Sequence, residues 1–191
     1  DGDTLAAVTY CPTTVNTEIG GKRISLHEVT SYPFENTVRF RIETDDPVSF
    51  TLRLRKPHWA VSTELTLNGT PLDISFTDQH ISLNREFRNG DEILLTFTDR
   101  VEFIENAGGV SVRKGALLYA LPIKERVVME GLRETGNTQF PRYSLYADSP
   151  WNYAIRANCD TVFANETEPG AQPWRISQNS LRLFSSRSAL K

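Results

Sequence analysis

Apolar and polar side chains alternate along most of the first two thirds of the chain, which is the pattern of strands that bury one face. The alternation is strict in Thr37–Glu43 and Ser49–Arg55, where arginines take polar positions. We expect these two segments to be neighbouring strands of one half-exposed sheet, with a turn at Asp45-Asp46-Pro47. Further strands are expected at Leu5–Tyr10, Lys22–Ser31, Glu64–Asn68, Ile81–Leu83, Glu92–Thr98, Gly109–Arg113 and Ala116–Leu121.

Turn residues separate these segments. Asn68-Gly69 is a strong hairpin signal, because a type I′ turn needs positive φ at both central positions. Gly20-Gly21 and Gly108-Gly109 are expected in hairpins as well. No segment before residue 122 shows the apolar period of a helix. The pattern therefore predicts an all-β fold, an antiparallel, jelly-roll-like β-sandwich whose two sheets face one core.

The pattern is weaker after residue 122. Ile123–Arg133 is charged and fits a short helix or an irregular link, and Gly136–Asp148 is expected to be a loop. Short strands are expected at Trp151–Ile155, Cys159–Phe163 and Leu181–Phe184. We predict two parts, a β-sandwich domain at residues 1–122 and, at residues 123–191, a linker with a smaller β-rich subdomain that need not be complete.

Composition excludes several classes of partner. A net charge of -3 with scattered lysines and arginines argues against nucleic acid and anionic membranes. The sequence contains neither an apolar run long enough for a membrane span nor a signal-peptide pattern, and it begins at Asp1 as if cut from a longer protein. Cys11 and Cys159 are expected to be buried free thiols, although a disulfide between them stays open.

Residues with catalytic or metal-binding potential are scattered. His27, His58 and His80 have no second ligand at metal spacing. The adjacent carboxylates Asp45-Asp46 and Asp91-Glu92 lie where turns meet strands, so bonding to backbone N–H groups explains them better than glycosidase chemistry. We therefore predict no catalytic residue, no metal site and no cofactor in this chain.

The three tryptophans carry the alternative hypothesis of a carbohydrate-binding module. Trp59, Trp151 and Trp174 are the residues on which sugar rings would stack if they lay exposed on one face. Aromatic side chains in β-sandwiches more often pack in the core or at an interface between domains. Both readings stay open from the sequence.

Several short motifs occur in an order that resembles one enzyme family. They are Tyr32-Pro33-Phe34, the run from Phe50 to Ala60 (FTLRLRKPHWA), Leu67-Asn68-Gly69, Asn84–Phe87 with Gly90–Ile93, and Arg113–Leu121. Over roughly residues 5–155 this order resembles the β-sandwich region that follows the catalytic domain in glycoside hydrolase family 127, the β-L-arabinofuranosidase-like family. The chain departs from the family pattern at Lys56, at Phe87 and at Lys114-Gly115-Ala116.

The resemblance implies an upstream (α/α) barrel whose cysteine nucleophile is held at zinc by a glutamate and further cysteines. None of those residues maps onto this chain, since Cys11 in Tyr10-Cys11-Pro12 lies outside that cluster. The implied role is a non-catalytic accessory domain, inactive alone, whose partner is the upstream catalytic domain of the same protein. Carbohydrate and a second copy of the chain stay open as further partners, and the resemblance implies a periplasmic or extracellular parent enzyme.

Overall fold

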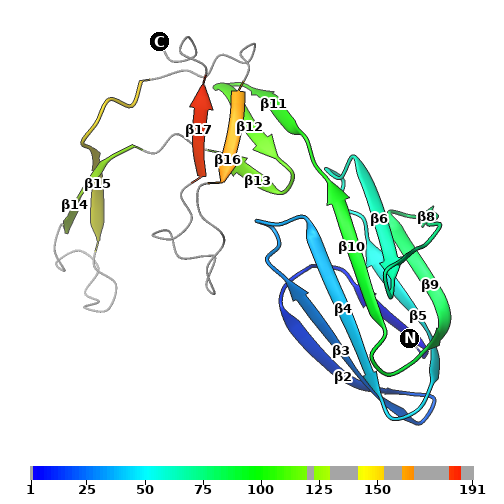
Figure 1. The fold of residues 1–191 in the computed structure, drawn as a ribbon. Coiled ribbons are helices and arrows are strands. Elements are labelled where there is room, and N and C mark those ends of the chain that lie inside the picture. Colours follow the sequence, from blue (N-terminus) through cyan, green and yellow to red (C-terminus); the bar gives the residue numbers. More distant parts are fainter. Residues whose placement is uncertain (1, 120–122, 130–141, 153–160, 166–180, 186–191) are drawn as a thin grey trace.

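The computed structural model describes residues 2–119, 123–129 and 142–152, together with the backbones of strands β16 (Thr161–Asn165) and β17 (Leu181–Ser185). Within these ranges every helix or strand assigned is a β-strand (Figure 1). The prediction of an all-β, sandwich-like fold is therefore confirmed.

Two sheets form the sandwich. The four-stranded sheet has the order β1-β5-β9-β8, and the six-stranded sheet has the order β2-β3-β4-β10-β6-β7. The first comprises β1 (Thr4–Ala7), β5 (Val48–Arg55), β8 (Phe76–Thr77) and β9 (His80–Phe87). The second comprises β2 (Thr13–Ile19), β3 (Lys22–Thr30), β4 (Thr37–Thr44), β6 (Ser62–Leu67), β7 (Thr70–Pro71) and β10 (Glu92–Thr98). Neighbouring strands are antiparallel except β1, which runs parallel to β5.

The core lies between the two sheets and is built from the alternating apolar positions. Phe40 on β4 is fully buried, as are Phe50 on β5 and Phe87 on β9. The rings of Phe50 and Phe87 lie 4.5 Å apart across the paired strands. Each such side chain contributes roughly 2–3 kcal/mol to stability through burial of apolar surface.

One predicted pairing is wrong. The segments Thr37–Glu43 and Ser49–Arg55 were expected to be neighbours, but β4 pairs with β3 and β10, whereas β5 pairs with β1 and β9. The chain crosses from one sheet to the other at residues 45–47, and the two apolar faces meet in the core. Alternation identifies the buried face of a strand but not its hydrogen-bonding partner.

The predicted hairpin turns are confirmed. Asn68 and Gly69 have φ of 50° and 78° between the paired residues Leu67 and Thr70. Gly20 and Gly21 have φ of 59° and 76° where β2 turns into β3. The strand β2 itself escaped prediction, because among its residues only Ile19 is fully buried and the strand lies at the edge of its sheet.

Smaller sheets follow the sandwich. Strands β11 (Val101–Asn106), β12 (Gly109–Lys114) and β13 (Leu117–Tyr119) form a three-stranded sheet. Strands β14 (Glu125–Met129) and β15 (Tyr143–Ala147) form a hairpin, and β16 pairs with β17.

The tail contains two wrong predictions. The strands β14 and β15 replace the expected helix or irregular link at Ile123–Arg133 and the expected loop at Gly136–Asp148. These two strands are stabilised by side-chain pairs across the hairpin, such as Val127 opposite Leu145. Such pairs join segments far apart in the sequence, so the pattern within either segment does not reveal them. The division of the chain near residue 122 stays a prediction.

Candidate functional site

A cleft with a volume of about 320 Å³ lies where the chain leaves β5 and turns through the corner Pro57-His58-Trp59. One wall is the segment Val8–Tyr10, which follows β1. The opposite wall is the turn between β12 and β13, with Gly115-Ala116 and the side chain of Arg113. The cleft therefore forms where the sandwich meets the three-stranded sheet.

Aromatic rings build the base of this cleft. Trp59 is only 7% exposed, and its ring stacks on Tyr32 with 6.3 Å between centroids and 18° between planes. Phe97 of β10 meets Trp59 edge-on at 5.6 Å, and Tyr10 lies 5.7 Å from Phe97. Offset and edge-to-face contacts of this kind hold rings in fixed positions, so the apolar base of the cleft is preformed.

Two polar contacts join β5 to the segment after β1. The buried hydroxyl of Tyr10 donates a hydrogen bond to the backbone carbonyl of Arg55, and burial raises the pKa of Tyr10 above its ordinary value. The Arg55 guanidinium donates through Nη1 to the carbonyl of Val8 at 3.3 Å. These bonds tie residues 8–10 to the corner and place Arg55 on the wall of the cleft.

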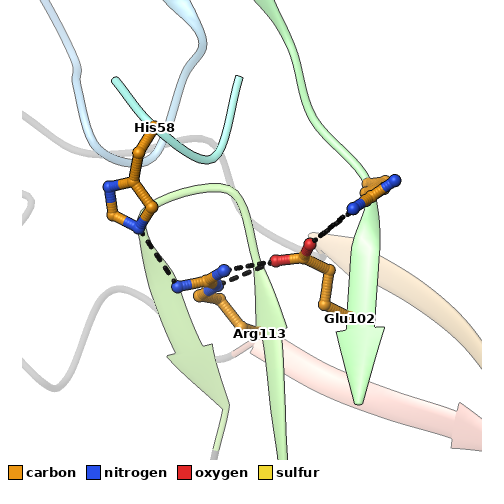
Figure 2. Close-up of polar contacts among 4 residues, drawn as sticks. His58, Glu102 and Arg113 are labelled. Atoms are coloured by element: carbon orange, nitrogen blue, oxygen red, sulfur yellow. Dashed lines mark hydrogen bonds and ion pairs between the residues drawn. The ribbon is translucent and has the colours of Figure 1, made fainter. Parts of the chain in front are cut away.

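A charged network lies beside the cleft (Figure 2). Arg113 of β12 donates to Glu102 of β11 through Nε at 3.0 Å and through Nη2. The Arg100 guanidinium also bonds Glu102, at 3.0 and 3.1 Å. Hydrogen bonds from Arg113 and then Arg100 lower the pKa of Glu102. The remaining contact of Arg113 is to Nε2 of His58 at 3.4 Å, which links the small sheet to the corner of the sandwich.

Glu28 is a buried carboxyl group that the sequence analysis missed. It lies on β3, is 6% exposed, and accepts a hydrogen bond from the backbone N–H of Cys11 at 2.9 Å. Burial raises the pKa of Glu28 to about 7. The sequence did contain a signal for this burial, because Glu28 occupies the next position in the alternating series of inward-facing residues Ile24 and Leu26.

The tryptophans of the carbohydrate-binding hypothesis do not gather at this cleft. Trp59 lines it, whereas Trp151 is 65% exposed and lies elsewhere, and Trp174 falls outside the described residues. Their role in binding sugar stays a prediction.

The other candidate residues have local structural partners. His27 pairs with Glu43 at 3.2 Å, and Nδ1 of His80 lies 2.8 Å from the carbonyl oxygen of Asp78. Asp91 accepts two hydrogen bonds at 2.8 Å, one from the backbone N–H of Arg88 and one from the side-chain amide of Asn68. The bond from Arg88 confirms the predicted role of Asp91 in its turn.

In the part of the chain that the structure describes, no group of three or more His, Cys, Asp or Glu side chains is placed to hold a metal ion. No helix suited to crossing a membrane occurs in the same ranges. Cys11 is a free thiol and is exposed, so the expectation that it is buried is wrong, while Cys159 lies outside the described residues.

Solved structures of glycoside hydrolases are similar to this chain. A GH127 β-L-arabinofuranosidase from Geobacillus stearothermophilus superposes with a TM-score of 0.59 at 22% identity, over 97% of this chain and 30% of that one. A GH127 β-arabinofuranosidase gives a TM-score of 0.56 at 14% identity, over 96% of this chain and 31% of that one. A third structure, described as a glycoside hydrolase, superposes with a TM-score of 0.53 at 26% identity, over 59% of this chain and 20% of that one. This chain thus spans less than a third of each matched chain.

Among the curated proteins, a search finds no match to this chain. Residues 4–98 match the family model of the β-L-arabinofuranosidase GH127 middle domain. The match begins at the first residue of β1 and ends at the last residue of β10, so it covers the two sheets of the sandwich. The chain therefore contains a GH127-related domain, in agreement with the family that its sequence motifs resemble.

Proposed function

We propose that this chain is the non-catalytic β part of a glycoside hydrolase of the β-L-arabinofuranosidase type, and that it packs on and supports an (α/α) barrel elsewhere in the same protein. The observation that carries the proposal is the match of residues 4–98 to a middle domain, which by its nature has further domains beside it. The nucleophile and the metal would then belong to the barrel, and this chain would be inactive alone.

An exposed apolar face on the β14–β15 hairpin supports the proposal. Val127 faces Leu145 and Met129 faces Tyr143, so these four side chains lie on one face of the hairpin. They are 53%, 65%, 58% and 56% exposed, respectively. A two-stranded hairpin is at best marginally stable in water, and a contiguous apolar surface of this kind typically marks an interface. A neighbouring domain of the parent enzyme would cover it.

The coding sequence upstream of Asp1 tests the proposal directly. We expect several hundred residues of helical sequence that carry a glutamate and clustered cysteines. The full-length protein should hydrolyse an aryl β-L-arabinofuranoside, and the 191-residue chain should not. An initiator methionine or a signal peptide immediately before Asp1 would overturn the proposal, as would hydrolysis by the chain alone.

A variant of the hairpin tests the packing separately. Leu145→Asp places a charge on the apolar face, so it should lower the melting temperature of the full-length protein but not that of the 191-residue chain, where Leu145 is exposed. Ser144→Asp, on the opposite face of the same strand, is the matched control. Equal effects of Leu145→Asp in the two proteins would show that no domain covers this face.

A further inference from the structure

The cleft at the Pro57–Trp59 corner has the chemistry of a site for an anion. Among the described residues that line it, Arg55 and Arg113 are cationic and none is acidic. Two carboxylates lie close by without lining the cleft: Glu102 is bonded to two guanidinium groups, and Asp99, next to Gly115, accepts a hydrogen bond from the Asn36 side chain. The walls of the cleft therefore carry net positive charge.

Arg55 is the residue with unused donors. A guanidinium presents five N–H donors, and within the described structure the Arg55 side chain makes one hydrogen bond, to the carbonyl of Val8. Arg113 differs, because all three of its guanidinium nitrogens contact Glu102 or His58, which holds its plane in place. Arg55 is thus half-buried, held at its backbone by Tyr10, and able to bind a planar anion with two parallel hydrogen bonds.

Much of the remaining lining is apolar or aromatic. It includes Pro57 and the stacked rings of Trp59 and Tyr32. A volume of about 320 Å³ falls at the lower end of the range for small-molecule sites. Such a space admits one ring of sugar size, with its apolar face against the aromatic side and a charged substituent toward Arg55.

We propose that this cleft binds a carboxylate carried on a small polar ring, the chemistry of a hexuronate residue, with Arg55 binding the carboxylate and the Trp59–Tyr32 side lying against the ring. The same carboxylate chemistry has a second source, an Asp or Glu side chain of another protein segment. The proposal rests on the lining of the cleft alone and does not require that the accessory role proposed above be correct.

Fluorescence of Trp59 provides the measurement. In a Trp151→Phe, Trp174→Phe background of the 191-residue chain, Trp59 is the sole tryptophan. This protein is titrated with D-galacturonate and with D-galactose, at low and at high salt. We expect a saturable signal for galacturonate only, weakened by salt because the pairing is electrostatic.

Substitution of Arg55 identifies the group responsible. Arg55→Gln should weaken galacturonate binding by about tenfold or more, since charge-assisted bidentate bonds are lost. Arg53→Gln is the matched control, because Arg53 lies two positions earlier on the same face of β5, is also half-buried and does not line the cleft. Arg55→Lys keeps the charge without the planar guanidinium, so it should bind galacturonate with intermediate affinity. If Arg55→Gln does not fold, Arg55→Lys tests the role of Arg55 in its place.

Each outcome decides the proposal. Acetate, or a peptide with a single glutamate, binding as tightly as galacturonate would overturn the assignment to a ring-borne carboxylate, because the ring would then add no affinity, and would point to an acidic side chain as the natural ligand. Equal binding of galactose and galacturonate, an unaffected Arg55→Gln variant, or no signal with any carboxylate would overturn the proposal. Those results leave the accessory role untouched, because that role is tested by the upstream sequence.

Discussion

The buried carboxyl of Glu28 makes the stability of the sandwich depend on pH. Its side chain is 6% exposed on β3, and it accepts a hydrogen bond from the backbone N–H of Cys11. The substitution Glu28→Gln removes the titrating group but keeps an oxygen that can accept the same bond. We predict that the variant resists a loss of stability that the wild-type chain suffers as the pH rises.

The size of the effect follows from the pKa. Burial raises the pKa of Glu28 from 4.5 to about 7. A raised pKa means that the folded state holds its proton where the unfolded state has released it, so the free energy of unfolding falls as pH rises through this window. Within this window each pH unit lowers the free energy of unfolding by about 1.4 kcal/mol, and the full loss is about 3 kcal/mol. Below the window both states are protonated and the wild-type chain should match Glu28→Gln.

Urea denaturation between about pH 4 and pH 8 measures this difference. The free energy of unfolding of Glu28→Gln should exceed that of the wild type by about 2–3 kcal/mol at the upper end of the range and converge with it at the lower end. Glu64→Gln, an exposed position on β6, is the control and should follow the wild type. Parallel wild-type and Glu28→Gln curves across this range would refute the reasoning, because the two proteins differ only at position 28.

Two further predictions concern the core and the cleft. Phe40→Ala, at a fully buried position, should lower the free energy of unfolding by about 3–5 kcal/mol. Phe76→Ala, on the exposed edge strand β8, should lower it by less than about 1 kcal/mol. Similar losses for the two variants in urea denaturation would contradict the placement of the core. Gly115 has φ of +57°, and a Cβ there would lie 3.3 Å from Asp99, while Gly20 has φ of +59° with open space around it. Gly115→Ala should therefore cost about 1 kcal/mol more than Gly20→Ala in the same assay, and equal costs would show that the neighbours of Gly115 give way.

Much of the sandwich could be predicted because its signals are local. The strand Glu92–Thr98 has the predicted bounds, and the Asn68-Gly69 turn has the predicted positive φ angles. Prediction failed where the signal was shared between distant segments. The hairpin of β14 and β15 depends on pairs such as Val127 with Leu145, and neither strand alternates clearly enough to be recognised by itself.

The candidate site was only partly foreseeable. Trp59 drew attention as an aromatic residue at a corner, but its stacking on Tyr32 and its burial are tertiary facts. Arg55 looked like one more polar position on an exposed strand face, and nothing in the sequence separates it from Arg53. The two arginines differ only in the tertiary structure, where Arg55 lines the cleft together with residues 8–10 and the β12–β13 turn, whereas Arg53 does not.

The sequence by itself determined most strands of the sandwich, the face that each of them buries and the hairpin turns between them, because a period of two and the φ preferences of Gly and Asn act within a few residues. Only the tertiary structure decided that β4 and β5 lie in opposite sheets, that Glu28 is buried, and that four separate segments enclose one cleft. These outcomes depend on hydrogen bonds and packing between residues far apart in the chain, for which no local pattern carries the information.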